Sequence, residues 1–528
     1  MTPILFDALS TITLGPHHKL PRSASTPHTG QGPPPAIPPQ IVGTSRDTTV
    51  VRIPIRSAKH HFGASVSRGM RPYNEDAYQA GVIDLPAFAK RAPISLTRPG
   101  RELMKGEGTS AEGASGDPQI FYFGVFDGHG GNECSDYLRE NLHGYIERAA
   151  KEFGLQSNLK TTKPYPGYNP SYEESLSSEF SHSDTNLPET VTPTNKKIAD
   201  LENSLVQDYK SLIGGYFNRF RPPYFTYGTP SLSSTSPTTN FPGDRPPSPT
   251  VYEVLAYAFL LADLDFIKLQ THRSSHVSDS CLADRPLNEG DTFSSPSHAP
   301  ESTSVNPITQ TVAKPPFLGG STASIALVST PNPTPFYHPT SPSTILTAHV
   351  GDTRIILCNT LTGLPVPLTS PHHPTTPLES TRLRRSGASF ISTDSFGESR
   401  LSGLANSRAF GDIRSKRLGV SSEPDVLLTQ LPPQAYSFLV LMSDGITDEA
   451  SDQEVVDIIK EAKTPEEGAR AVVKYAGEVG TGGDNATCLV VRLGGWERRG
   501  EGGVGSLGTR EMREWKRREN DDGRRARM

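Results

Sequence analysis

Acidic residues occur at the ends of several predicted strands, where the edge of a sheet could bring them together. They are Glu75, Asp127, Asp352, Asp444 and Asp484. In an antiparallel sheet the end of one strand and the start of its neighbour share an edge, so these carboxylates can converge. Like charges packed together are unfavourable unless cations neutralise them, and oxygen ligands favour Mg²⁺ or Mn²⁺ over zinc. The set therefore predicts a metal site, although each acid taken singly is more often a turn residue.

A pair of divalent metal ions would suggest a particular chemistry. Two such ions about 3.5–4 Å apart can hydrolyse phosphate esters, because they activate a water and hold the attacking and leaving oxygens. The reaction also needs a cation for the phosphate and an acid for the leaving group. Arg71 and His129 lie in the same two segments as Glu75 and Asp127. Asp127-Gly128 alone is a common hairpin-turn signal, but the recurrence of the pattern downstream favours the metal site.

Strands and helices alternate in the segments that would position these residues. Strands are predicted at 62–67, 77–83, 120–126, 324–328, 345–350, 354–358, 438–443 and 486–493. The strand at 354–358 is expected to be the hairpin partner of 345–350. Apolar spacing predicts helices over 132–153, 198–220 and 251–269. Three further helix starts are predicted at Thr376, Ser451 and Thr464, each followed by a glutamate three residues later.

Composition limits how much of the chain can fold. Only 34% of the 528 residues are hydrophobic, while glycine and proline number 47 and 48, so we expect one core with disordered insertions. The expected organisation is a disordered leader over 1–58, a catalytic domain over 59–495 and a disordered charged tail over 496–528. The domain is interrupted by low-complexity insertions at about 86–118, 155–250 and 272–314.

Several classes of protein are disfavoured by the same composition. The net charge of −5 gives no reason to expect a nucleic-acid partner. The four cysteines lie far apart with no CxxC pair, which argues against a zinc site or a disulfide framework. No apolar run approaches the roughly 18–20 residues that span a bilayer, so no integral membrane segment is expected.

The first 45 residues contain one acidic residue, Asp7, together with several serines and threonines and a few basic residues. This composition is compatible with a mitochondrial presequence. We therefore expect a mitochondrial location. A plain disordered leader, and with it a cytoplasmic or nuclear location, stays open.

Short motifs in a fixed order point to a known family. They are RPYNED at 71–76, FDGHGG at 126–131, GGSTA at 319–323, VGD at 350–352, LANSRAFGD at 404–412, EPDV at 423–426, SDGITD at 443–448 and DN at 484–485. In this order they resemble the metal-dependent serine/threonine protein phosphatases of the type 2C family, here a fungal-type member with long insertions. The resemblance implies an α+β fold, a four-layer α-β-β-α sandwich of two antiparallel sheets flanked by helices.

The resemblance also implies the metal ligands. Asp127 would bridge two Mg²⁺ or Mn²⁺ ions, and the backbone carbonyl of Gly128 would complete one of the two sites. Asp444 and Asp484 would hold the other ion, and Glu75 would act partly through water.

The remaining matched residues would complete the chemistry. Asp352 and Asp448 match positions that, with Asp444, hold a third, weaker metal in family members. Arg71 would bind the phosphate, and His129 would protonate the leaving oxygen. The implied reaction is hydrolysis of phosphoserine and phosphothreonine in protein substrates by a metal-activated water, without a phosphoenzyme, in a monomeric enzyme. The alternative is a pseudophosphatase that binds phosphoproteins as a scaffold, although all matched metal acids are present.

Other residues in the motifs are expected to be structural. Arg408 and Asp412 are predicted to form an ion pair that fixes the elements around them. Asp76 is interpreted as a supporting acid rather than a direct metal ligand. His372 and His373 precede a proline in a loop, and no metal is assigned to them.

Overall fold

The computed structural model describes residues 61–90, 117–159, 193–227, 249–273, 319–385, 391–393, 399–401, 403–480, 483–500 and 507–527. All of them belong to one compact unit that comprises Ile53–Met528. The leader predicted over 1–58 therefore lies outside the described residues. So do most of the insertion predicted at 272–314 and long parts of the other two.

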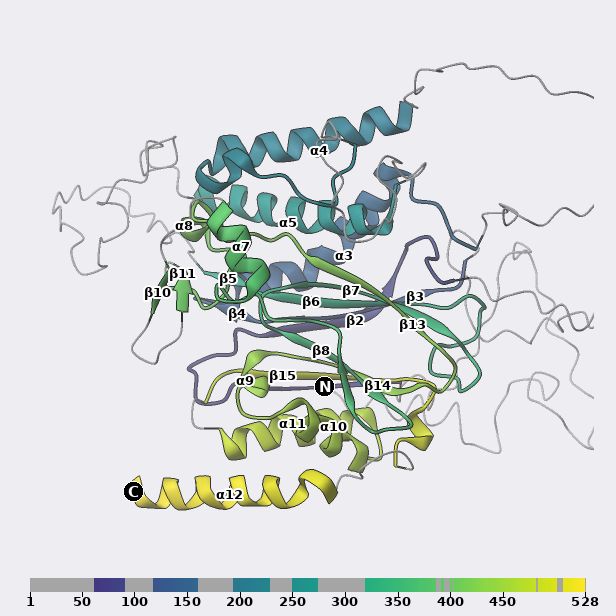
Figure 1. The fold of residues 1–528 in the computed structure, drawn as a ribbon, viewed down its shortest axis with the longest axis vertical. Coiled ribbons are helices and arrows are strands. Elements are labelled where there is room, and N and C mark those ends of the chain that lie inside the picture. Colours follow the sequence, from purple (N-terminus) through teal and green to yellow (C-terminus); the bar gives the residue numbers. More distant parts are fainter. Residues whose placement is uncertain are drawn as a thin grey trace, which may run out of the picture. The chain divides into compact units, whose positions relative to one another are not determined.

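Two five-stranded antiparallel sheets form the centre of this unit (Figure 1). The first has the order β13-β7-β6-β3-β2, with β2 (Ala77–Ile83), β3 (Ile120–Phe126), β6 (Ala323–Ser329), β7 (Ser343–Val350) and β13 (Asp425–Leu431). The second has the order β1-β15-β14-β8-β9, with β1 (Phe62–Ser67), β8 (Arg354–Asn359), β9 (Pro365–Pro367), β14 (Tyr436–Met442) and β15 (Ala486–Arg492). All eight strands predicted from the sequence are present, with ends shifted by at most two residues.

Apolar side chains from both sheets pack into one layer between them. Phe123 and Ala326 of the first sheet share a buried cluster with Leu441 and Leu489 of the second. β6 and β7 are buried along their whole length, which explains the apolar run over 325–328 in β6. The two sheets therefore pack face to face around a common core.

Helices cover the outer face of each sheet (Figure 1). The first sheet is covered by α3 (Glu133–Phe153) and α5 (Val251–Arg273), with α4 (Pro193–Leu212) outside them. The second is covered by α10 (Asp452–Glu461) and α11 (Pro465–Val479), and α12 (Leu507–Arg527) lies against these two helices. The predicted four-layer α+β sandwich is confirmed, with α4 and α12 added outside it. None of the helices in the described part of the chain is long and apolar enough to cross a membrane.

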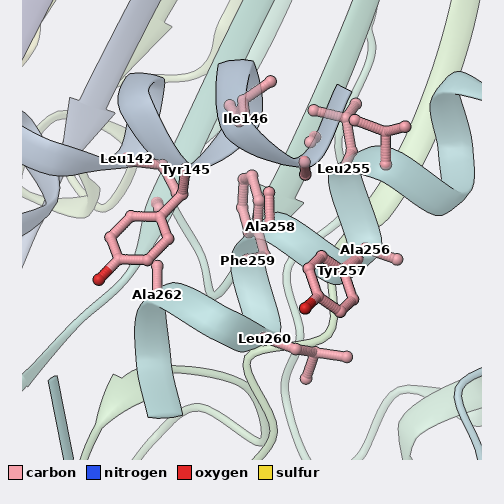
Figure 2. Close-up of a cluster of buried hydrophobic side chains, with 14 of the residues drawn as sticks. Leu142, Tyr145, Ile146, Leu255, Ala256, Tyr257, Ala258, Phe259, Leu260 and Ala262 are labelled. Carbon is pink, nitrogen blue, oxygen red and sulfur yellow. The ribbon is translucent and has the colours of Figure 1, made fainter. Parts of the chain in front are cut away.

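Helix α5 is apolar on all sides because other elements surround it. Its residues Leu255, Ala258 and Phe259 pack near Leu142 and Ile146 of α3 (Figure 2). On another side α4 approaches it, since the Tyr209 hydroxyl donates to the carbonyl of Leu260 at 2.8 Å. A helix that is hydrophobic all round is expected to be buried in this way.

Shorter elements connect the layers. A three-stranded sheet has the order β12-β5-β4, with β4 (Gly128–His129), β5 (Gly320–Ser321) and β12 (Phe410–Gly411). A separate pair consists of β10 (Ile391–Thr393) and β11 (Ser399–Leu401). The short helices are η2 (Gly215–Arg219), α7 (Pro377–Arg385), α8 (Ile413–Lys416), α9 (Asp444–Thr447) and η4 (Trp496–Arg498).

One predicted pairing is wrong. β8 pairs with β14 and β9 in the second sheet, whereas β7 pairs with β6 and β13 in the first. The two strands are consecutive, but the turn between them passes from one sheet to the other. A short link between two apolar strands cannot by itself distinguish a hairpin from a crossing between packed sheets.

The expected insertions and tail contain more structure than their composition suggests. Helix α4 and η2 lie within the stretch 155–250, where a helix was predicted over 198–220, and Phe88 of the stretch 86–118 is buried in the core. The segment 496–528 differs from the predicted disordered tail, because Trp496 is buried and α12 is a helix. The division into leader, catalytic domain and tail otherwise stays a prediction.

Candidate active site

The strand register brings the predicted acids to one end of the two sheets. β3 ends at Phe126, beside the first residue of β2, and β7 ends at Val350, beside the first residue of β6. In the second sheet β14 ends at Met442 near the start of β15, and Ala486 at that start pairs with the last residue of β1. The residues that follow or precede these strand ends are therefore neighbours, although they lie far apart in the sequence.

Asp127, Asp352 and Asp444 form the centre of this end. One carboxylate oxygen from each lies within 4.8 Å of the others. The Asp444 amide also donates to Asp127 Oδ2 at 3.4 Å. The buried Oδ1 of Asp352 has no hydrogen-bond partner in the described part of the chain. Three converging carboxylates with an unsatisfied oxygen among them fit a hard divalent cation.

The electrostatics of the three carboxylates agree with this fit. Burial, followed by the charges of Asp444, Asp76 and Asp352, raises the pKa of Asp127 well above its ordinary value. Burial and the charge of Asp352 likewise raise the pKa of Asp444. Ionising all three carboxylates together is unfavourable. A bound cation would instead stabilise their ionised forms and lower their pKa values.

Glu75 lies beside the cluster in the segment that joins β1 to β2. Its Oε1 accepts from the Gly131 amide at 2.5 Å, and its own amide donates to Asn485 Oδ1 at 2.7 Å. A Cβ at Gly128 would lie only 2.5 Å from the Glu75 carbonyl oxygen, so only glycine fits there. These contacts bring the Glu75 segment against β4.

Arg71 and Asp484 meet at the rim of the site. Arg71 Nη2 lies 2.7 Å from Asp484 Oδ2, and the two side chains are 51% and 41% exposed. The hydrogen bond that Arg71 donates to Asp484 is the main cause that raises the pKa of Arg71. The charges of Asp448 and Asp484 both raise the pKa of Asp444. These two acids therefore lie near Asp444, while the three-carboxylate cluster of the described residues does not include them.

His129 contacts Asp412, a residue that was predicted from the sequence to pair with Arg408 instead. Its Nε2 lies 2.9 Å from both carboxylate oxygens of Asp412. Burial lowers the pKa of His129, but the hydrogen bond and charge of Asp412 more than offset this, so its pKa is raised. The predicted Arg408–Asp412 ion pair is wrong, because Arg408 instead pairs with Glu379 at 2.6 Å and with Asp425 at 2.8 Å.

Two further motif residues, Asp76 and His372, contact residues next to the candidate metal-binding acids. Asp76 Oδ2 accepts from Ser443 and Thr487, and burial raises the pKa of Asp76 to about 6. His372 contacts Asp425 and accepts from the Gly351 amide, next to Asp352. These contacts agree with the supporting role expected for Asp76.

Three residues support the candidate site in a way that was not predicted from the sequence. From the sequence, Glu379 is predicted to cap a helix, and Asp412 is predicted to pair with Arg408. Asn485 was noted only as part of a motif, yet its side chain joins Glu75 to the carbonyls of Arg68 and Tyr73. Its position next to Asp484 is the only signal that could have identified it.

Comparison with known proteins agrees with this geometry. Residues 270–485 match the family model described as Protein phosphatase 2C. "Protein phosphatase 2C homolog 4" of Schizosaccharomyces pombe is 29% identical over 450 residues, which cover 85% of this chain and 84% of the relative. The chain therefore contains a protein phosphatase 2C domain. Its enzyme class is therefore protein serine/threonine phosphatase.

Two further proteins are similar to this chain over a shorter stretch or at lower identity. "Protein phosphatase 1K, mitochondrial" of Xenopus laevis is 37% identical over 153 residues, 29% of this chain and 40% of the relative. A solved serine-threonine phosphatase 2C from Toxoplasma gondii superposes with a TM-score of 0.43 at 14% identity, covering 82% of this chain and 94% of that one.

Proposed function

We propose that this phosphatase hydrolyses phosphoserine and phosphothreonine esters of proteins with a water activated by two Mg²⁺ or Mn²⁺ ions. No phosphoenzyme forms, and the enzyme acts on phosphoprotein substrates as a monomer, with no nucleic-acid partner. The observation that supports this proposal most strongly is the convergence of Asp127, Asp352 and Asp444 within 4.8 Å. When bound, the ions would lower the pKa of a water and neutralise charge on the phosphate.

The acidic residues have distinct roles in this proposal. Asp127 would contribute to both metal sites, the Gly128 carbonyl would complete one of them, and Asp444 and Asp484 would hold the other. Glu75 acts partly through water, in keeping with its position beside β4.

A third, weaker ion would use Asp352 and Asp448 together with Asp444. The inclusion of Asp352 in the carboxylate cluster supports its part in this site. The charge of Asp448 raises the pKa of Asp444, which supports the part of Asp448 in the same site.

Arg71 and His129 act on the substrate itself. Arg71 is half exposed at the rim, so a phosphate can reach its guanidinium, which binds phosphate well because of its planar set of donors. His129 is partly exposed and gives a proton to the oxygen that leaves phosphorus.

Substitution of the central acids tests the proposal. Asp127→Ala or Asp444→Ala should lower Mn²⁺-dependent hydrolysis of a phosphothreonine peptide by about 100-fold or more, because metal affinity is lost. Both variants should stay folded, with a metal-free melting temperature equal to or above that of the wild type, since each relieves repulsion between carboxylates. Asp84→Ala, which removes a surface acid paired with Lys151, is the control. Normal turnover in either test variant would contradict the proposal.

The alternative of a non-hydrolysing scaffold has no observation in its favour among the described residues. Every acid that the motifs predicted as a metal ligand lies in or beside the cluster. Purified protein that was inert toward several phosphopeptides with both Mg²⁺ and Mn²⁺ would revive it.

We also propose a mitochondrial location. The composition of the leader and the name of one relative, "Protein phosphatase 1K, mitochondrial", support it. A fluorescent reporter fused to residues 1–58 should enter mitochondria. Fluorescence spread through the cytosol or nucleus would count against the proposal.

A further inference from the structure

His129 and Asp412 are carried by the two outer strands of one small sheet. His129 is the second residue of β4, and Asp412 directly follows β12. Both outer strands pair with β5, where Gly320 is the partner of His129 on one side and of Gly411 on the other. The contact between the imidazole and the carboxylate therefore spans the central strand at Gly320.

Gly320 leaves the space that this contact needs. A Cβ at this position would lie 2.3 Å from Asp412 Oδ2 and 2.4 Å from the Phe410 carbonyl oxygen. Any side chain there would displace the carboxylate or the neighbouring strand. The glycine thus lets Asp412 reach across β5 to the ring of His129.

The backbone around Asp412 is held firmly. Asp412 has a φ of 49°, in the left-handed region that aspartate tolerates better than most residues. Its amide donates to the Gly319 carbonyl at 3.2 Å. The preceding Gly411 amide donates to Asp263 at 2.8 Å, and Asp263 forms a fully buried ion pair with Lys416 at 2.7 Å. The position of the Asp412 carboxylate is therefore fixed by helix α5 as well as by the small sheet.

The contact determines which ring nitrogen of His129 is available. A carboxylate only accepts hydrogen bonds, so Nε2, at 2.9 Å from both oxygens, carries a hydrogen and is occupied. Nδ1 is the nitrogen that remains, on a side chain that is 37% exposed, while Asp412 is only 5% exposed. A buried carboxylate that orients a partly exposed imidazole is a recurrent way to position a proton donor.

We propose that Asp412 is the positioning residue for His129 and that it orients the ring so that Nδ1 delivers the proton to the leaving oxygen. This inference rests on the proposed function, in which His129 is the proton donor. In that step the bond between phosphorus and the serine or threonine oxygen breaks, and its electron pair stays on that oxygen. The oxygen then takes the proton from Nδ1. The oxygen of water bonds to phosphorus and this water releases one proton to solvent, while solvent returns a proton to His129.

Two substrates separate this role from a merely structural one. A phosphothreonine peptide releases an alkoxide, which needs a proton as it leaves, whereas p-nitrophenyl phosphate releases a stable phenolate that does not. Loss of proton delivery should therefore slow the first substrate far more than the second. Damage to the fold or to metal binding would slow both alike.

Asp412→Asn should lower kcat for the phosphopeptide by about 10- to 100-fold and change kcat for p-nitrophenyl phosphate by less than about threefold. Asp412→Glu keeps the carboxylate and should recover part of the loss. The double variant Asp412→Asn with His129→Gln should be no slower than His129→Gln alone, because the two residues act as one unit. Asp208→Asn, which changes a surface partner of Lys268, is the matched control and should behave as the wild type.

The outcomes distinguish this inference from the proposed function. Equal losses on both substrates, an unchanged phosphopeptide rate, or additive losses in the double variant would overturn the role of Asp412. A wild type inactive on both substrates, or a His129→Gln variant that slows both equally, would instead contradict the proposed function itself. Melting temperature and Mn²⁺ binding by calorimetry should match the wild type in Asp412→Asn. If that variant fails to fold, Asp412→Glu carries the same comparison of substrates.

Discussion

At the scale of single residues, a buried ionic network supports the site. Arg408 donates to Glu379 and Asp425, and Asp425 contacts His372, which accepts from the Gly351 amide. Gly351 precedes Asp352, so the network ends at the backbone of the carboxylate cluster. Burial alone would raise the pKa of Glu379, but the charges of Arg408 and Arg382 hold it well below its ordinary value. Because removal of one partner leaves an unpaired buried charge, such networks are sensitive to single substitutions.

Glu379→Gln should lower the free energy of unfolding at pH 7 by about 3 kcal/mol, because Arg408 loses its closest charged partner. A carboxylate whose folded pKa is depressed contributes stability above its unfolded pKa of about 4, and that stability is lost as the pH falls. The difference between wild type and variant should therefore narrow by about 1 kcal/mol between pH 7 and pH 3.5. Urea unfolding of both proteins at the two pH values measures this difference in the free energy of unfolding.

The matched control for this prediction is Glu466→Gln. Glu466 is 62% exposed and pairs with Arg470 on the surface of α11. It should change stability by less than about 0.5 kcal/mol at either pH. A difference between wild type and Glu379→Gln that stayed constant with pH would show that the charge of Glu379 is not what stabilises the fold.

At the scale of elements, local signals predicted where helices begin better than what their side chains contact. Helix α10 begins with the expected capping box, in which Ser451 and Glu454 bond reciprocally. Helix α11 begins at Thr464, whose side chain accepts from the Glu467 amide. Helix α7 also begins where Thr376 predicted it, but Glu379 turns away to the buried arginines. Local spacing does not reveal that a distant arginine competes for the capping carboxylate.

Pairing between distant segments was the part that the sequence could not supply. Asp127, Asp352 and Asp444 were correctly expected at strand ends, because each closely follows a predicted buried strand. Which strand lies next to which depends on packing of the whole core. The assumed hairpin of β7 and β8 failed for this reason, as did the assumed Arg408–Asp412 pair. Nothing in the sequence around Gly320 of β5 indicated that Asp412 would reach His129 across this glycine.

At the scale of the whole molecule, the outermost helix is attached differently from the core. The two sheets share a layer of fully buried apolar side chains. Helix α12, by contrast, is attached to α10 and α11 through ion pairs, with Arg513 bonded to Glu461 at 3.0 Å, and Arg517 bonded to Glu478 at 2.7 Å. Its arginine-rich sequence looked like a mobile tail because the acidic partners lie on other helices. Stability is not uniform across a protein, and elements held mainly by surface charges open most easily.

Raising the salt concentration should therefore detach α12 from its neighbouring helices before it destabilises the core. The screening length falls from about 10 Å at 0.1 M salt to about 3 Å at 1 M, which weakens partly exposed ion pairs. Hydrogen exchange over 507–527 should accelerate between 0.1 and 1 M NaCl, while exchange over β14 stays the same.

A pair of double variants identifies the contacts responsible for this release. Arg513→Ala with Arg517→Ala should accelerate this exchange already at 0.1 M NaCl, because two of the three ion pairs that the described residues form with the neighbouring helices are gone and only that of Lys516 with Glu454 remains. The control, Arg510→Ala with Arg518→Ala, removes pairs to Glu514 within α12 itself and should leave protection nearly unchanged. Mass spectrometry of peptides from 507–527 and from β14 reports both elements in one experiment. Protection of α12 that survived both 1 M NaCl and the loss of Arg513 and Arg517 would mean that apolar packing, rather than charge, holds this helix to the molecule.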